Sequence, residues 1–131
     1  MKCLIVDDEI FCREFVATLL KDIAECRQAG SGKEAVAKYT EALESGSPYD
    51  LIILDIMMPD MSGHDVAKEI RALEKERKAG GVKIIMLTAL NSPTDAMDSF
   101  FNAQSAAYLV KPISKDGLFN VIGKLGLGRK K

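Results

Sequence analysis

The stretch LIILDIMMPDMSG, Leu51 to Gly63, places four unbroken apolar residues directly before a single carboxylate, Asp55. Four aliphatic residues without polar alternation are typical of a strand buried on both faces, as in a parallel sheet covered by helices. Asp55 then lies at the carboxyl end of that strand, where open α/β sheets gather their ligands. Taken alone, Asp55 could equally be a residue that merely ends a strand. The residues elsewhere in the chain distinguish this role from a functional one.

Four further short apolar runs predict the other strands, at Cys3–Val6, Cys26–Ala29, Lys83–Leu87 and Ala106–Val110. The segments between and after the runs carry apolar residues at intervals of three and four, which is typical of amphipathic helices. The apolar positions of these five predicted helices are Phe11, Phe15, Val16, Leu19, Leu20 and Ile23; Ala35, Val36, Tyr39 and Leu43; Val66, Ala67, Ile70 and Leu73; Met97, Phe100 and Phe101; and Leu118, Val121, Ile122 and Leu125.

Polar residues and glycines mark the predicted helix ends. Asp8 is a candidate cap for the first helix, and Ser31 with Glu34 forms a capping box for the second. Ser114 caps the last helix. Gly80 and Gly81 are predicted to end the third.

Alternation of five strands with five helices, without a hairpin signal, specifies a parallel sheet with helices on both faces. Right-handed crossovers leave few topologies, and we predict a flavodoxin-like α/β fold with strand order 2-1-3-4-5. The length of 131 residues fits one domain, residues 1–131, and the absence of an interdomain linker favours a free-standing one.

The composition excludes several classes of function. Lys and Arg number 18 against 19 Asp and Glu, so no overall charge favours nucleic acid or an anionic membrane, and the basic residues 129–131 are a solvated tail. The cysteines Cys3, Cys12 and Cys26 show no metal-binding spacing and are odd in number, which predicts free thiols in a reducing cytosol. Without a signal or membrane-spanning segment, a cytoplasmic monomer is expected.

Polar residues follow four of the predicted strands: Asp7 and Asp8, Asp55, Thr88 and Lys111. In the predicted order these four strands are neighbours, so the side chains meet in one cleft. Crowded carboxylates need a cation or must take up protons. A set of oxygen ligands without Cys or His suits Mg²⁺, which in turn suggests phosphate chemistry. A carboxylate can attack phosphorus to form an acyl phosphate, and Asp55 is the candidate nucleophile.

In these residues the chain resembles the response-regulator receiver domain of two-component signalling, and most of all its stand-alone chemotaxis members. The resemblance rests on Asp7-Asp8, the stretch around Asp55, Thr88-Ala89 and YLVKP, Tyr108 to Pro112, in this order and at these separations. It covers nearly the whole chain.

The resemblance implies a role for each of these residues. Asp55 would accept phosphate from a phosphohistidine of a sensor histidine kinase. Mg²⁺ would be bound by Asp8, Asp55 and the main-chain carbonyl of Met57, with Asp7 acting through water. Lys111 and Thr88 would contact the phosphoryl group, and Lys111-Pro112 would be a cis peptide. Thr88 and Tyr108 would form a switch that alters the last two helices and the last strand, where a downstream target protein binds.

The chain also departs from the family pattern. Gln104 stands seven residues before Lys111, where the family usually has glycine. Met57 and Leu90, two residues after Asp55 and Thr88, are apolar at positions beside the path of a hydrolytic water. Such a pair predicts a long-lived phosphorylated state.

A signalling switch of this kind would not be an enzyme in the usual sense. Two other functions are possible for a chain of this fold. A phosphatase or phosphotransferase of the haloacid-dehalogenase type would carry Asp-x-Asp after the first strand, whereas Asp7 and Asp8 are adjacent. A flavin carrier of the same topology needs a first loop rich in Ser, Thr and Gly, and the acidic loop DDEIFC would repel the flavin phosphate.

Overall fold

A computed structural model describes residues 1–78, 81–88 and 107–127. The strands are β1 (Lys2–Val6), β2 (Glu25–Ala29), β3 (Leu51–Asp55), β4 (Lys83–Thr88) and β5 (Ala107–Val110). The helices are α1 (Ile10–Leu20), α2 (Gly32–Glu44), α3 (Gly63–Arg77) and α5 (Lys115–Lys124). The predicted fourth helix and the position of Gln104 lie outside the described residues. No helix in the described ranges is long and apolar enough to cross a membrane.

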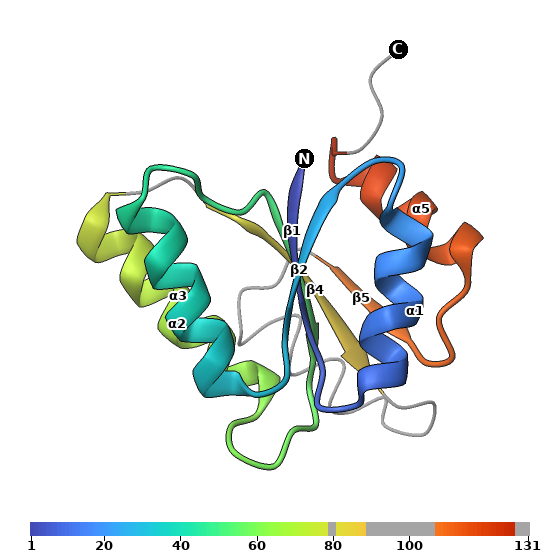
Figure 1. The fold of residues 1–131 in the computed structure, drawn as a ribbon, viewed down its shortest axis with the longest axis horizontal. Helices are drawn as coiled ribbons and strands as arrows, with labels where there is room; N and C mark the ends of the chain where they lie inside the picture. Colours follow the sequence, from blue (N-terminus) through green and yellow to red (C-terminus); the bar gives the residue numbers. More distant parts are fainter. Residues whose placement is uncertain (79–80, 89–106, 128–131) are drawn as a thin grey trace.

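The strands form one parallel sheet in the order β2-β1-β3-β4-β5, which confirms the predicted topology (Figure 1). β1 lies between β2 and β3, and its Val6 is in register with Leu54 of β3. On the other side of β3, Asp55 is in register with Leu87 of β4. The carboxyl ends of β1 and β3 are therefore neighbours, although about 48 residues of chain separate them.

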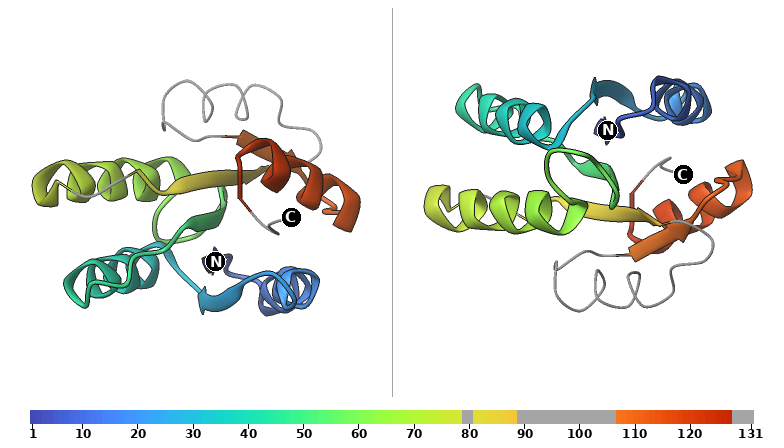
Figure 2. Two further views of the ribbon diagram at one scale, coloured as in Figure 1. Left: turned by 90° about the horizontal axis from the view of Figure 1, so that it is seen from above. Right: turned by 90° about the horizontal axis from the view of Figure 1, so that it is seen from below.

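The sheet separates two apolar clusters because successive strand residues point to opposite faces. Leu4 and Val6 of β1 contribute to the cluster under α2 and α3, whereas Cys3 and Ile5 contribute to the cluster under α1 and α5. Figures 1 and 2 show the same arrangement, with α2 and α3 on one face and α1 and α5 on the other. All five residues of β3 are buried, as the unbroken apolar run predicts.

Helix α1 buries a narrower face than its apolar pattern predicts. Only Val16 and Leu20 are fully buried, while Phe11 is 87% exposed and Phe15 is 48% exposed. Ile23 lies beyond the end of the helix, which is at Leu20. The prediction that Phe11 and Phe15 pack into the core is wrong. The sheet covers only the side of α1 that carries Val16 and Leu20.

Two predicted helix caps are confirmed and two predicted ends are wrong. Ser31 and Ser114 accept hydrogen bonds from the main-chain N–H groups of residues 34 and 117. The N-cap of α1 is Glu9, without a side-chain cap, rather than Asp8. Helix α3 ends before the predicted glycines, because Lys78 adopts the left-handed conformation (φ 54°) and its N–H group bonds to the helix end.

A buried carboxylate, Glu74, lies on the apolar face of α3, four residues after Ile70. Its Oε2 accepts hydrogen bonds from the Tyr39 hydroxyl and from the Val82 main-chain N–H, each at 2.7 Å. Its Oε1 forms an ion pair with Arg71 at 2.8 Å. Glu74 therefore joins α2, α3 and the start of β4, and every one of these contacts is to a group that is itself at least partly buried.

Candidate functional site

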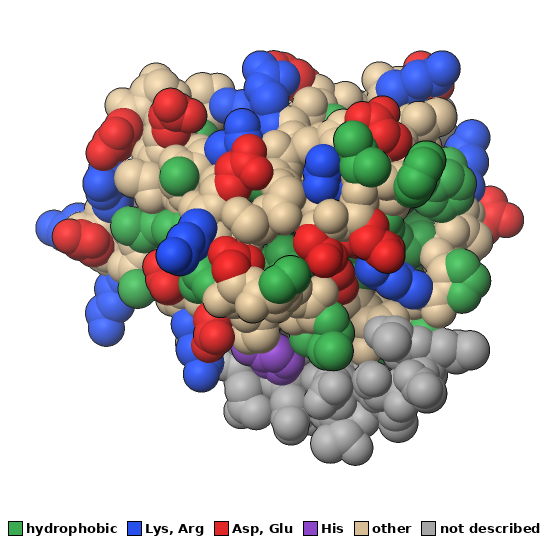
Figure 3. Space-filling view, turned by 60° about the horizontal axis from the view of Figure 1, so that its bottom comes forward, with side chains coloured by type: hydrophobic (Ala, Val, Ile, Leu, Met, Phe, Trp, Pro, Cys, Tyr) green, Lys and Arg blue, Asp and Glu red, His purple; other side chains and the backbone are tan. Residues whose placement is uncertain are grey.

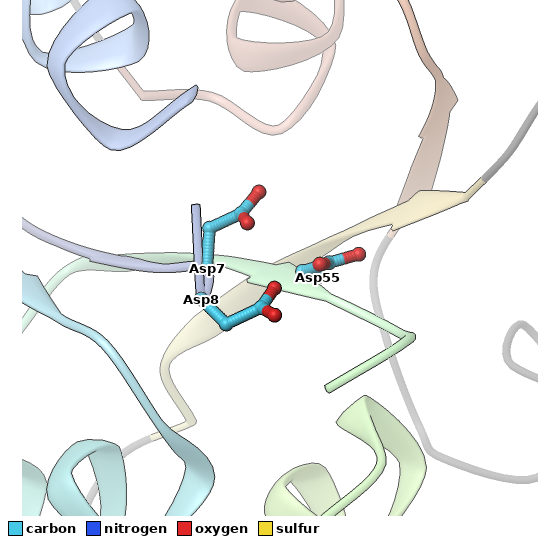
Figure 4. Close-up of side chains that lie close together, drawn as sticks. All are labelled: Asp7, Asp8 and Asp55. Atoms are coloured by element: carbon cyan, nitrogen blue, oxygen red, sulfur yellow. The ribbon is translucent and has the colours of Figure 1, made fainter. Parts of the chain in front are cut away.

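Three carboxylates meet at the carboxyl ends of two neighbouring strands. Asp7 and Asp8 follow β1, and Asp55 is the last residue of β3. Oxygen atoms of all three lie within 4.8 Å of one another, and Figure 4 shows the side chains together beyond the strand ends. Acidic side chains also gather near the middle of this end of the molecule in the space-filling view, beside apolar and basic ones (Figure 3). The predicted convergence of these residues is confirmed.

Asp7 is fully buried and held by donors on both carboxylate oxygens. Its Oδ1 accepts the main-chain N–H of Glu9 at 2.9 Å, and its Oδ2 lies 3.1 Å from Nζ of Lys111. Burial opposes ionisation, but hydrogen bonds from the Cys12 thiol, the Glu9 N–H and Lys111 outweigh it and lower the pKa of Asp7. Asp7 is thus a fixed negative charge.

Lys111 brings the only described ammonium into ion-pair distance of the cluster. It follows β5, and its Nζ lies 3.1 Å from Asp7 Oδ2 and 3.6 Å from Asp55 Oδ1. Partial burial opposes its charge, but the two carboxylates prevail and raise its pKa. Lys111 therefore stays protonated and lies beside Asp55.

The surroundings of Asp55 disfavour the ionised form of its carboxyl group. Only 5% of its surface is exposed, and its Oδ1 accepts one main-chain hydrogen bond, from Met57 at 3.3 Å. Burial, followed by the neighbouring charge of Asp7, raises the pKa of Asp55 to about 6. Lys111 offsets this effect only in part. The site has more negative charge than its own lysine can neutralise.

The donor set fits a hard divalent cation. Three carboxylates share one ammonium, and a cavity of about 270 Å³ opens beside them, lined by Asp8, Glu9, Asp55, Met57 and Lys111. Mg²⁺ is commonly held by one or two carboxylates plus water. Asp8 is exposed and Asp55 borders the cavity, so both can supply ligands, whereas the oxygens of Asp7 are already engaged. That Asp7 acts on the cation through water stays a prediction.

Thr88 and Tyr108, the predicted switch residues, lie on neighbouring strands. Thr88 ends β4 and is 2% exposed, and its main-chain carbonyl accepts the N–H of Lys111 at 2.8 Å. Tyr108 lies in β5 and is 36% exposed. The Lys111-Pro112 peptide is cis, as the resemblance implies. Ala89 and Leu90 lie outside the described residues.

The loop after Asp55 is closed by a hydrogen bond between its two ends and is anchored to α2 through Asp60. Gly63 donates its N–H to the carbonyl of Ile56 at 2.8 Å, and a Cβ at this position would lie 2.7 Å from the carbonyl oxygen of Asp55. Earlier in the loop, the Asp60 carboxylate accepts the N–H groups of Gly32 and Lys33, each at 3.0 Å, which lower its pKa. The loop that lines the cavity is therefore attached to both α2 and α3.

Sequence reasoning missed two residues that support the site. Arg13 of α1 donates from Nη1 to the main-chain carbonyl of Asp7 at 2.7 Å and from Nε to Gln28 at 3.1 Å. Asp60 anchors the loop, as described above. A basic residue in the first turns of a helix and an Asp in a loop are both common in other roles, so no pattern distinguishes them before the fold is known.

Comparison with known proteins agrees with this geometry. Residues 3–123 match the sequence profile described as the response regulator receiver domain. Chemotaxis protein CheY of Bacillus subtilis is 32% identical over 125 residues, which cover 94% of this chain and 95% of that protein. The transcriptional regulatory protein ResD of the same organism is 40% identical over 114 residues. The chain spans 42% of the length of ResD and 7% of the hybrid signal transduction histidine kinase L of Dictyostelium discoideum, which is 35% identical.

Solved structures show the same fold. Chemotaxis protein CheY4 of Vibrio cholerae superposes with a TM-score of 0.79 at 32% identity, covering 94% of this chain and 96% of that one. The response regulator protein TrrA of Thermotoga maritima, solved in complex with Mg²⁺-BeF, has a TM-score of 0.74 at 37% identity, with 95% and 97% covered.

Proposed function

Because the chain belongs to the response regulator receiver family, we propose that it is a switch in which Asp55 accepts a phosphoryl group from the phosphohistidine of a sensor histidine kinase. The observation that carries this proposal is the position of Asp55, buried at the end of the central strand within reach of two other carboxylates and Lys111. A receiver domain is a phosphorylation-dependent switch of two-component signalling, not an enzyme that turns over a substrate.

In the transfer, a carboxylate oxygen of Asp55 attacks phosphorus as the bond from phosphorus to the histidine nitrogen breaks. Lys111, already 3.6 Å from Asp55 Oδ1, offsets negative charge on the transferred oxygens, and the hydroxyl of Thr88 donates to one of them. Mg²⁺, held by Asp8, Asp55 and the main-chain carbonyl of Met57, would supply further neutralisation of that charge. The relative TrrA was solved with Mg²⁺-BeF, which supports this choice of metal.

The response is proposed to pass through Thr88 and Tyr108. Movement of the Thr88 hydroxyl toward the phosphoryl group leaves room for the Tyr108 ring to turn inward. The ring is partly exposed, so this turn would bury it further. The changed surface of β5, α5 and the predicted fourth helix would then bind a downstream target protein. Relatives that match over nearly their whole length include chemotaxis proteins, so we propose a monomeric regulator of this type that binds a protein target and not nucleic acid.

An aspartyl-intermediate phosphatase is less well supported. In that reaction class one acid of the pair after β1 attacks phosphorus. Here both oxygens of Asp7 are occupied by the Glu9 N–H and Lys111, and Asp8 is exposed at the cavity rim. The buried acid with the raised pKa is Asp55 on the third strand.

The direct test is incubation of the chain with acetyl phosphate and Mg²⁺, followed by mass spectrometry. We expect one added phosphoryl group, mapped to Asp55 and released by hydroxylamine, which cleaves acyl phosphates. Phosphate on a serine or threonine, or none at all, would contradict the proposal.

Magnesium is expected to stabilise the chain, because the cation binds a site that exists only when folding has brought Asp8 and Asp55 together. A Mg²⁺ concentration near one hundred times Kd should raise Tm by roughly 5–10 °C. The Asp8→Ala variant should lose most of this rise, while Glu76→Ala, which removes an exposed acid of α3, should keep it. Melting is followed by circular dichroism with MgCl₂ or with EDTA. An equal rise in wild type and Asp8→Ala would remove Asp8 from the ligand set.

Met57 is expected to lengthen the life of the phosphorylated state. Its side chain is 66% exposed and borders the cavity beside Asp55, where an apolar group cannot orient a water for attack on phosphorus. Met57→Asn with Leu90→Glu should speed phosphate loss roughly ten-fold, equivalent to about 1.4 kcal/mol of activation free energy. Met57→Leu, which stays apolar, should leave the rate unchanged.

The measurement is decay of phosphorylated protein after the phosphodonor is removed, at constant Mg²⁺. Labelling rates should be equal in all variants. Slower or unchanged decay in the double variant would mean that these side chains do not control access of water.

A further inference from the structure

Two cysteines lie side by side at the amino-terminal end of the sheet, away from the acidic cluster. In the parallel pairing of β1 with β2, Cys3 is the register partner of Cys26. Neighbouring strands lie about 4.8 Å apart, within the range of about 4.4–6.8 Å that Cα atoms of a disulfide span. Both residues pack into the apolar cluster under α1 and α5, so both side chains project from the same face of the sheet.

The two thiols differ in accessibility and in ease of ionisation. Cys3 is completely buried, while Cys26, on the edge strand, is partly exposed. The Cys3 thiol hydrogen-bonds to the sulfur of Cys26, whose Sγ in turn lies 3.9 Å from the carbonyl oxygen of Ala24. This bond, together with burial, raises the pKa of Cys3 well above its usual value, and the same bond lowers the pKa of Cys26. An oxidant therefore reaches Cys26 first and finds the better nucleophile there.

We propose that Cys3 and Cys26 form an oxidation site that reacts with hydrogen peroxide and closes to a disulfide between β1 and β2. In the first step the sulfur of Cys26 attacks one peroxide oxygen and the O–O bond breaks. The other oxygen leaves as water with the thiol proton, so Cys26 becomes a sulfenic acid.

In the second step the sulfur of Cys3 attacks Sγ of Cys26, and the S–O bond breaks. The hydroxyl leaves as a second water with the proton of Cys3. The two thiols together lose two protons and two electrons, and the peroxide is reduced to two waters. The poor acidity of Cys3 slows this step, while its position on the neighbouring strand favours it.

Cys12 is the natural internal comparison. It lies in α1 and its thiol hydrogen-bonds to Asp7, which follows the opposite end of β1 from Cys3. It has no register partner among the strands. We expect it to stay reduced when Cys3 and Cys26 are joined.

The experiment treats the folded full chain with hydrogen peroxide in EDTA, alkylates remaining thiols after unfolding, and measures the intact mass. Wild type should lose two hydrogens, retain one alkylatable thiol and recover all three after dithiothreitol. Because trypsin leaves Cys3 and Cys12 in one peptide, residues 3–13, the linkage is mapped in Cys12→Ser, where a bond to the peptide of residues 22–27 can come only from Cys3. Cys26→Ser should lose the reaction entirely.

Three results would overturn the proposal: oxygen added to Cys26 while Cys3 stays alkylatable, a disulfide that contains Cys12 or joins two chains, or no reaction under conditions that oxidise a free-cysteine peptide. Circular dichroism establishes that each variant is folded. The mass change of the wild type together with the linkage mapped in Cys12→Ser decides the matter, and neither measurement requires a variant at buried Cys3.

Discussion

Substitution of Asp55 by asparagine is expected to reduce labelling by acetyl phosphate to background while the sheet remains intact. The change removes the attacking oxygen but keeps the volume of the side chain at a position that is only 5% exposed. Labelling is measured with radioactive phosphodonor and Mg²⁺, and the fold by circular dichroism. Asp22→Asn, an exposed acid outside the cluster, is the matched control and should label like wild type. Stoichiometric labelling of Asp55→Asn would show that phosphate goes elsewhere.

The same substitution should stabilise the metal-free protein, and only at neutral pH. The pKa of Asp55 is raised in the folded state from 3.8 to about 6, so its contribution to stability is fully present below about pH 4 and is lost as pH rises through 6. Above pH 6 the wild type holds an unfavourable charge that asparagine does not carry. The difference amounts to about 3 kcal/mol of unfolding free energy.

Urea unfolding in EDTA at pH 7.5 and pH 4 measures this difference. Asp55→Asn should exceed wild type at pH 7.5 and equal or trail it at pH 4. A gain of the same size at both pH values would mean that packing, and not charge, changed.

Removal of the Glu74 side chain is expected to destabilise the protein by roughly 3 kcal/mol, since hydrogen bonds to charged groups contribute about 1.5–3 kcal/mol each. Glu74→Ala leaves the Tyr39 hydroxyl and the Val82 N–H without the acceptor that each has at 2.7 Å. It also leaves the partly buried guanidinium of Arg71 without its 2.8 Å ion pair. Urea unfolding at pH 7.5 measures the loss.

The control is Glu69→Ala, which removes an exposed glutamate from the same helix and should change stability by less than about 0.5 kcal/mol. Tyr39→Phe should cost about 1.5 kcal/mol in wild type and much less in Glu74→Ala, because the two groups share one hydrogen bond. Equal losses for Glu74→Ala and Glu69→Ala would mean that the buried network contributes nothing.

The strands and their order are predictable because burial on both faces demands unbroken apolar runs, of which LIIL, residues 51–54, is the strongest. The convergence of Asp7, Asp55 and Lys111 then follows from topology, since parallel strands bring their carboxyl ends to one edge. No measurement of side chains is needed for that step.

The wrong predictions of burial and of a helix end concern residues whose structure depends on partners distant in the sequence. Periodicity marks Phe11 and Phe15 as one stripe with Val16, but the sheet covers only part of that stripe. Glu74 belongs to a residue type that is seldom buried, and its burial depends on Tyr39, 35 residues earlier in the chain. Lys78 takes a left-handed conformation that sequence assigns to a nearby glycine.

The contact of Gly63 with Asp55 limits which substitutions, insertions and deletions can persist in this loop. Any side chain at position 63 would place its Cβ 2.7 Å from the carbonyl oxygen of Asp55 and 2.9 Å from Cα of Ile56, both main-chain atoms that cannot move aside as a side-chain tip can. An insertion or deletion between them would also separate the Gly63 N–H from the Ile56 carbonyl. Lineages descended from this sequence should therefore keep both the glycine and the number of residues between it and Ile56.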